Sequence, residues 1–204
     1  TIKHLPDEGI TYQIGNTASF GEAFQVPVVC DFRTQDVALG GQGAPLVPIG
    51  DEYLFSEYNY CLNLGGIANI SYEKDGKRMA YDIAPANIVL NYYANKLGQA
   101  YDKFGRFAMD GKLDQETLNK LNSLEYYKQE APKSLGKEWV FGEVLPILEN
   151  SNLKVRDILH TYCQHLATQI NQQVEADKRV LITGGGAYNK FLIGLLDEKV
   201  KWRI

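Results

Sequence analysis

Glycines gathered in clusters beside short apolar runs constrain the fold of this chain more than any other feature. Three clusters hold eight of the 19 glycines: Gly40, Gly41 and Gly43; Gly65 and Gly66; and Gly184, Gly185 and Gly186. Each cluster lies next to the expected end of a β-strand, where backbone without side chains can turn sharply or approach a ligand. One such cluster would be ordinary, and three of them predict a single shared ligand site.

The apolar runs around these glycines predict an α/β fold. Residues 26–32 are expected to form a buried strand, residues 60–64 and 67–72 a hairpin turned by Gly65 and Gly66, and residues 79–82 a third strand. A helix follows from about residue 88 to Leu97, with Gly98 just past its end. Three antiparallel strands followed by a helix are typical of the opening of a ribonuclease H-like unit.

The C-terminal part of the chain continues the α/β pattern. Residues 153–176 contain no Gly or Pro and carry apolar residues at helical spacing, which predicts a long amphipathic helix. A short apolar strand at 179–183, the three glycines and another helix come next. This order places Gly184, Gly185 and Gly186 at the carboxyl end of a strand, where α/β sheets bind their ligands.

Composition and charge exclude several classes of protein. The net charge is −4 without a basic run, which argues against nucleic acid as a partner. No apolar stretch approaches the roughly 20 residues of a membrane span, so we expect no membrane association. The cysteines Cys30, Cys61 and Cys163 are odd in number and widely spaced, which favours reduced core thiols in a cytoplasmic protein. No Cys/His pattern indicates a structural metal.

Taken singly, the motifs leave alternatives open. The turn at Gly65 and Gly66 suits a polyphosphate, although a plain hairpin explains it equally well or better. The loop at Gly184 suits a nucleotide at a helix N-terminus, or only a tight strand-to-helix turn. Asp31, Arg33 and Asp36 precede a glycine loop, where a carboxylate could act as a general base or the charges could form a surface ion pair.

Six segments, in this order, resemble the anhydro-N-acetylmuramic acid kinases of the sugar kinase, heat-shock cognate and actin superfamily. They are DFRTQDVALGGQGAPLVP, LNLGGIANIS, YDIAPANIVLN, YDKFGRFAMDG, APKSLGKEW and ITGGGAYN. The resemblance implies an actin-like ATPase fold with a mixed sheet flanked by helices. It divides the chain into a remnant of a first lobe, residues 1–58, and a second ribonuclease H-like lobe, residues 59–204.

The resemblance also implies a reaction and a set of site residues. These kinases use ATP and water to convert 1,6-anhydro-N-acetylmuramic acid, a small-molecule sugar, to N-acetylmuramic acid 6-phosphate in peptidoglycan recycling, with Mg²⁺ held mainly through the phosphates. Asp36 matches the catalytic aspartate. The sugar side is implied to include Arg33, Gly43, Gly15 and Asn16. The nucleotide side is implied to include Gly65, Gly66, Asn69, Gly184, Gly185, Gly186 and Asn189. A homodimer is compatible with the sequence.

Two departures from the family pattern keep other functions open. The first phosphate loop, Ser-Gly-Thr-Ser-Leu-Asp-Gly, is absent, so the chain resembles a fragment from which we expect little or no turnover. The family's Asp-Thr-Gly-Pro-Gly-Asn is replaced by residues 82–87, DIAPAN, which would add methyl groups beside the phosphates. The alternatives are a non-catalytic relative that binds nucleotide or sugar, and a kinase for another sugar.

Overall fold

The computed structural model describes residues 3–5, 8–12, 19–41, 43 and 46–204. The chain divides into two compact units, Thr1–Val47 and Pro48–Ile204. The sequence places this division after residue 58 instead. The helix α3 (Pro48–Leu54) belongs to the second unit because it packs on the sheet there.

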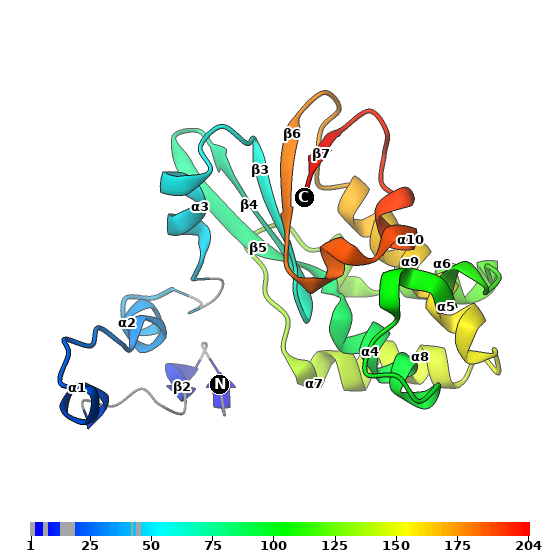
Figure 1. Cartoon of the computed structure of the whole chain (residues 1–204), viewed down its shortest axis with the longest axis horizontal. Coiled ribbons are helices and arrows are strands. Elements are labelled where there is room, and N and C mark those ends of the chain that lie inside the picture. The colour runs from blue at the N-terminus through cyan, green and yellow to red at the C-terminus, as the bar shows by residue number, and fades with distance from the viewer. Residues whose placement is uncertain (1–2, 6–7, 13–18, 42, 44–45) are drawn as a thin grey trace. The chain divides into compact units, whose positions relative to one another are not determined.

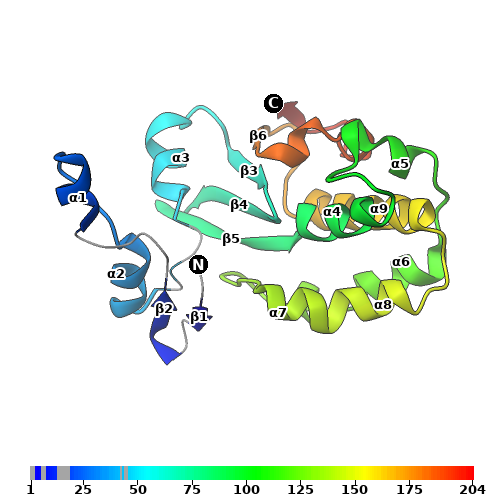
Figure 2. The same ribbon diagram turned by 60° about the horizontal axis from the view of Figure 1, so that its bottom comes forward.

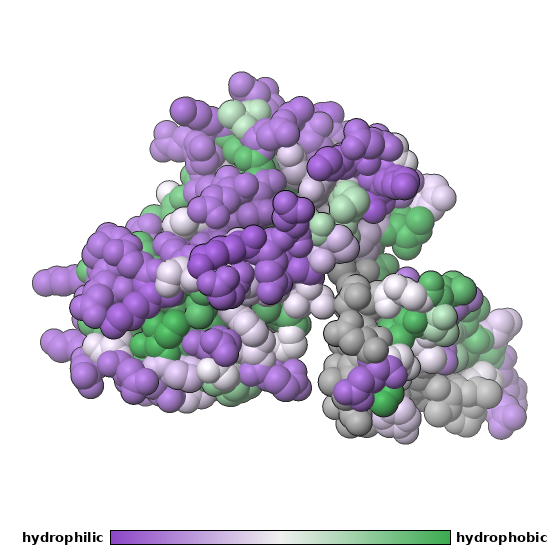
Figure 3. Space-filling view, turned by 180° about the vertical axis from the view of Figure 1, so that it is seen from behind, coloured by the Kyte–Doolittle hydropathy of each residue, from purple (hydrophilic) through white to green (hydrophobic). Residues whose placement is uncertain are grey.

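The first unit is small and lacks the strand that its sequence predicts. It contains an antiparallel pair, β1 (Lys3–Leu5) and β2 (Ile10–Tyr12), and two helices, α1 (Ser19–Phe24) and α2 (Phe32–Ala38). Residues 26–31 form no regular element. An apolar run becomes a strand only when a neighbouring strand pairs with it, and none does so in the described part of this unit. Instead, apolar side chains of this segment and of α2 are exposed: Val26, Val28, Val29, Phe32 and Leu39. Figure 3 shows green, hydrophobic areas on the surface of the smaller body.

The second unit is built on a five-stranded mixed sheet (Figure 1). Its strands are β3 (Tyr60–Leu64), β4 (Ile67–Lys74), β5 (Lys77–Pro85), β6 (Arg179–Thr183) and β7 (Lys201–Arg203), in the spatial order β5-β4-β3-β6-β7. β4 is antiparallel to both of its neighbours, whereas β3, β6 and β7 are parallel. This order and these directions confirm the predicted ribonuclease H-like unit.

Helices between β5 and β6 supply the other layer of the fold. They are α4 (Asn87–Lys96), α5 (Arg106–Met109), α6 (Gln115–Asn122), α7 (Lys137–Trp139), α8 (Leu145–Glu149) and α9 (Val155–Asn171), with α10 (Lys190–Gly194) after β6. Short 3₁₀ turns lie at Lys103–Gly105, Glu125–Lys128 and Gly185–Tyr188, and a π-helical turn at Val140–Val144. Figure 2 shows α4 and α9 lying side by side, with α6 and α8 beyond them. No helix in the described ranges is both long and apolar enough to span a bilayer.

The core lies between one face of the sheet and these helices. Leu62 and Ile70 are paired across β3 and β4, and both are buried with Leu159 and Leu166 of α9. Leu, Ile and Val side chains buried in this way stabilise the fold by about 2 kcal/mol each. The predicted long helix is therefore confirmed by its buried stripe, although it begins at Val155 and ends at Asn171.

The opposite face of the sheet holds α3 through a polar network. Ser71 Oγ donates to Asp51 Oδ2 at 2.5 Å, and Arg78 Nη2 donates to Ser71 Oγ at 2.8 Å. Cys61, which pairs with Ser71 across the strands, is buried beside this network. The expectation of core thiols thus holds for Cys61 and Cys163, but Cys30 is exposed because its segment forms no strand.

Candidate functional site

The turn between β3 and β4 is joined to the start of α4 by main-chain hydrogen bonds. Gly66 O accepts from Ala86 N at 2.8 Å and from Ile88 N at 3.1 Å, and Gly65 O accepts from Asn87 N at 3.1 Å. Neither glycine has a positive φ angle. A Cβ at Gly66 would meet no atom within 4 Å, so the turn presents bare backbone at its outer side.

The glycine loop after β6 packs directly on the end of β3. Gly184 has a φ of +83°, and a Cβ there would lie 2.8 Å from the carbonyl of Leu64 and 2.6 Å from Asn63 Oδ1. A Cβ at Gly186 would lie 2.7 Å from Leu64 Cβ. Gly185, between them, faces open space. Two of the three predicted glycine clusters therefore meet around Leu64, within one unit of the protein.

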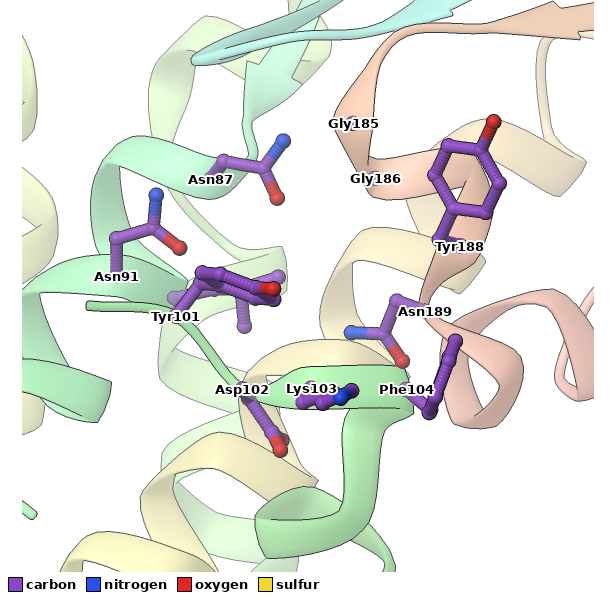
Figure 4. Close-up of a pocket in the computed structure, with 11 residues that line it drawn as sticks. Asn87, Asn91, Tyr101, Asp102, Lys103, Phe104, Gly185, Gly186, Tyr188 and Asn189 are labelled. Carbon is purple, nitrogen blue, oxygen red and sulfur yellow. The ribbon is translucent and has the colours of Figure 1, made fainter. Parts of the chain in front are cut away.

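A pocket of about 400 Å³ opens beside this meeting point, between α4 and the Gly185–Tyr188 turn (Figure 4). Its lining residues come from α4, the segment before α5, and the glycine loop: Asn87, Leu90, Asn91, Tyr101, Asp102, Lys103, Phe104, Gly185, Gly186, Tyr188 and Asn189. The volume is within the range of small-molecule sites. Of the predicted nucleotide residues, Gly185, Gly186 and Asn189 line this pocket.

Three polar side chains of the lining are bonded within the protein. Asn87 Nδ2 donates to Leu64 O at 2.9 Å. Asn189 Oδ1 accepts from Leu192 N at 3.0 Å and so caps α10, while its Nδ2 faces Cys163 Sγ at 3.9 Å. The two oxygens of Asp102 accept from the main-chain N–H groups of residues 107 and 108 at 2.9 and 3.0 Å. These bonds fix the shape of the pocket.

The buried thiol beneath Asn189 is chemically quiet. Cys163 is fully buried, and this burial raises the pKa of the thiol to about 12. A protonated thiol is a poor nucleophile and a poor metal ligand. Cys163 therefore supports the floor of the pocket by packing.

Aromatic rings and cations surround the outer part of the pocket. Tyr101 is 58% exposed and Tyr188 is 68% exposed, although both line the site. The ring of Phe104 has three cations near its centroid, at 5.7 Å for Lys103 Nζ, 5.9 Å for the Arg106 guanidinium and 5.3 Å for Lys190 Nζ. The rim can thus offer flat apolar surface and positive charge to an anionic ring-containing ligand.

Asn69 does not line the pocket. It lies on β4 opposite Asn63 of β3, next to an irregularity in strand pairing at residues 68 and 69. Asn63, which the sequence analysis did not single out, lies beneath Gly184 instead. Nothing in the sequence around Asn63 indicates a place in the site, because its contact is with a loop more than 100 residues away.

The substituted motif at residues 82–87 does not add methyl groups to the pocket surface. Ile83, Ala84 and Ala86 are at most 2% exposed and belong to the hydrophobic core. Asn87, the last residue of the motif, does line the pocket. These three side chains therefore do not crowd the pocket beside the glycine loop.

Asp36, Arg33 and Gly43 come together within the first unit. Asp36 lies on α2, and its Oδ2 accepts from Gly43 N at 2.7 Å. Arg33 Nη1 donates to Gly43 O, while its buried Nε has no hydrogen-bond partner among the described residues. Gly41 leaves no room for a Cβ against the Asp36 carboxylate. Gly15 and Asn16 lie outside the described residues.

Two buried titratable groups lie in the second unit but outside the pocket lining. Asp82 Oδ2 accepts from Leu135 N at 2.9 Å, and burial raises the pKa of its carboxyl group to about 6. His165 lies between Asn122 Oδ1 at 2.7 Å and the Tyr127 hydroxyl at 2.9 Å, and burial lowers its pKa to about 3. Both groups are neutral in the folded protein at mildly acidic pH. His165 is a core residue of α9.

Comparison with known proteins identifies the relatives of this chain. The family described as Anhydro-N-acetylmuramic acid kinase matches residues 1–203. The proteins of that name from Pseudomonas syringae pv. syringae and Aliivibrio fischeri are each 36% identical to this chain, over 97% and 95% of its length. The protein from Vibrio vulnificus strain YJ016 is 34% identical over 100% of the chain.

The match covers only part of each relative. The chain spans 57% of the Pseudomonas protein, 56% of the Aliivibrio protein and 59% of the Vibrio protein. Among solved structures, the activator of the 2-hydroxyisocaproyl-CoA dehydratase from Clostridium difficile with bound ADPNP is 14% identical, with a TM-score of 0.46 over 76% of this chain and 57% of that one. The sequence matches decide the relationship, and the chain belongs to the anhydro-N-acetylmuramic acid kinase family.

Proposed function

We propose that this chain supplies the nucleotide site and the catalytic aspartate of an ATP-dependent 1,6-anhydro-N-acetylmuramic acid kinase. The observation that carries the proposal is the meeting of two glycine clusters around Leu64, beside a pocket of about 400 Å³. Family membership supplies the reaction, which the relatives are named for. The sugar, the nucleotide and a cytoplasmic setting all belong to this proposal.

ATP would bind with its adenosine in the pocket and its phosphates toward the bare turn at Gly66. Gly185 is open to the pocket, and the tight packing of Gly184 and Gly186 lets the loop approach β3 closely. The rim cations Lys103, Arg106 and Lys190 favour a polyanion electrostatically. These features favour a nucleotide-binding loop over the alternative, a tight strand-to-helix turn that serves only packing.

Mg²⁺ would be held through the phosphates and water. No three His, Cys, Asp or Glu side chains gather into a metal site among the described residues. The carboxylate in the pocket, Asp102, has both oxygens hydrogen-bonded to main-chain N–H groups. When bound, the ion would supply charge compensation for the transferred phosphoryl group.

Asp36 would act as the general base. Its Oδ2 is held by Gly43 N, so Oδ1 remains to take a proton from water as that water attacks the anomeric carbon. The bond between the anomeric carbon and the 6-oxygen breaks, and the freed 6-oxygen attacks the γ-phosphorus while ADP leaves. Arg33, held on Gly43 O, would lie near the sugar side of this reaction.

The test measures sugar-dependent release of ADP. Because the family implies a further phosphate loop, the assay uses a fusion in which the N-terminal segment of the Pseudomonas syringae relative precedes this chain. We expect Asp36→Asn to lower the rate by at least about 100-fold, the usual contribution of a general base. Asp31→Asn is the matched control, since it makes the same change five residues earlier on the chain. An unchanged rate in Asp36→Asn, with an active parent fusion, would remove the assigned role.

We prefer the kinase proposal to a non-catalytic relative that binds nucleotide or sugar. The alanines that replace the family's glycines, Ala84 and Ala86, are buried in the core and do not narrow the pocket. A panel of other sugars in the same assay tests the remaining alternative, a kinase for a different substrate.

A further inference from the structure

Several polar side chains of the pocket have no hydrogen-bond partner among the described residues: Asn91, Tyr101, Lys103 and Tyr188. Asn91 is the amide among them, with both a donor and an acceptor. Asn87, Asn189 and Asp102 are hydrogen-bonded to main-chain or capping groups. The main-chain oxygen of Asn91 accepts a hydrogen bond from Asn95 Nδ2 at 2.7 Å, but this bond does not involve the side chain of Asn91. No described residue hydrogen-bonds the side-chain amide of Asn91, so its donor and its acceptor are both available to a ligand.

The place of Asn91 in the pocket suits contact with the edge of a flat ring. It lies one turn after Asn87 on the same face of α4, and both residues line the pocket. Figure 4 shows its amide projecting into the pocket beside the ring of Tyr101. Tyr101 is 58% exposed, so a face of its ring is open to stacking. The amide then lies at the edge of whatever stacks there.

We propose that Asn91 reads the edge of the nucleotide base while the base stacks on Tyr101. This inference rests on the nucleotide site proposed above and assigns its base specificity. Adenine presents an amino group that donates and an adjacent ring nitrogen that accepts. Asn91 Oδ1 accepts from the first and Nδ2 donates to the second, as a side-chain amide does when it reads adenine elsewhere.

Replacing the amide of Asn91 by a carboxylate should shift the preference from adenine toward guanine. A carboxylate only accepts, so it keeps one bond to the adenine amino group and faces the lone pair of the ring nitrogen. Guanine offers two neighbouring donors, N1–H and the 2-amino group, which a carboxylate accepts together. An amide can also face guanine by turning over, and for this reason the carboxylate variant is the informative one.

The experiment compares the dissociation constants of ADP and GDP, measured by titration calorimetry on the 204-residue chain. We expect Asn91→Asp to change the ratio of the two constants in favour of GDP by about tenfold or more. The ratio cancels the general repulsion between an added carboxylate and the phosphates. Asn95→Asp is the matched control, because it adds the same charge one turn further along α4 and outside the pocket lining. Its ratio should change less than twofold.

The outcomes distinguish failure of the Asn91 inference from failure of the proposed nucleotide site. An unchanged ratio in Asn91→Asp, while the parent chain binds ADP, overturns the reading of the base and leaves the kinase proposal standing. Failure of the parent chain to bind either nucleotide at millimolar concentration overturns both. If circular dichroism shows that Asn91→Asp does not fold, Asn91→Ala serves instead. It should weaken ADP binding about fivefold, and unchanged affinity would again overturn the inference.

Discussion

Asn87 Nδ2 donates to the main-chain oxygen of Leu64 at 2.9 Å, so the first residue of α4 is tied to the last residue of β3. Leu64 is fully buried. The same strand end receives Gly184 and Gly186 of the distant glycine loop. Asn87 therefore links both glycine turns of the proposed nucleotide site to the start of α4.

Removing this link should destabilise the second unit. Asn87→Ala leaves the buried oxygen of Leu64 without its donor, which costs about 1–3 kcal/mol. Urea unfolding followed by circular dichroism measures the loss. Asn95→Ala is the control, because its amide bonds an accessible part of the same helix, and it should change the unfolding free energy by less than about 0.5 kcal/mol. Equal effects of the two variants would contradict the prediction.

Neighbouring glycines of the loop should respond differently to alanine. Gly184→Ala places a Cβ 2.8 Å from the Leu64 main chain at a φ of +83°, and we expect a loss of about 3 kcal/mol in unfolding free energy. Gly185→Ala meets no atom within 4 Å, so stability should change by less than about 0.5 kcal/mol. Because Gly185 lines the pocket, the same variant should weaken ADP binding. Thermal unfolding with and without ADP separates the two effects.

Asp82 should make the folded state less stable as the pH rises. Its folded pKa of about 6 lies above the ordinary value of 3.8, so the native state holds a proton that the unfolded chain releases across this window. Its stabilising contribution is present below about pH 4 and is lost as the pH rises through 6. Asp82→Asn removes this dependence, and its stability relative to the parent should increase by about 1.4 kcal/mol per pH unit between pH 4 and 6. Urea midpoints at several pH values test the slope.

His165 should act in the opposite direction. Its folded pKa of about 3 lies below the ordinary value of 6.5, so the unfolded chain takes up a proton that the native state excludes. The stability due to neutral His165 is present above about pH 6.5 and is lost as the pH falls toward 3. His165→Gln should remove this sensitivity to acid, at some cost from the bonds to Asn122 and Tyr127. In the parent protein the pH dependences of stability due to Asp82 and His165 have opposite signs and nearly cancel between pH 4 and 6. The slope due to His165 is therefore measured in Asp82→Asn, and the slope due to Asp82 in His165→Gln.

Local patterns in the sequence were sufficient to predict much of the second unit. The hairpin at β3 and β4, the helix ending before Gly98 and the strand β6 all follow from short-range signals, such as turn glycines and apolar runs. Gly98 has a φ of +76°, as a helix-ending glycine should. The strand expected at residues 26–32 did not form, because pairing depends on neighbours that an apolar pattern does not reveal.

Of the candidate site, the sequence predicts mainly the glycine motifs. Of the three glycine clusters expected to share one site, the two in the second unit meet at the start of α4. The third, at Gly40, Gly41 and Gly43, belongs to the first unit. Asn91 and Tyr101 stand at the ends of two segments that carry the family resemblance, YDIAPANIVLN and YDKFGRFAMDG, but neither residue was predicted to belong to the site. Asp36 and Arg33 were expected next to the glycine loop at the end of a strand; they lie on α2, and both side chains contact Gly43.

The buried thiol of Cys163, beneath Asn189, can report how often the floor of the pocket opens. Alkylating reagents reach exposed Cys30 at once, whereas Cys163 reacts only after the floor has opened. The rate at which Cys163 becomes labelled therefore measures how often this part of the fold comes apart. A ligand held against the floor would slow that labelling in proportion to its occupancy.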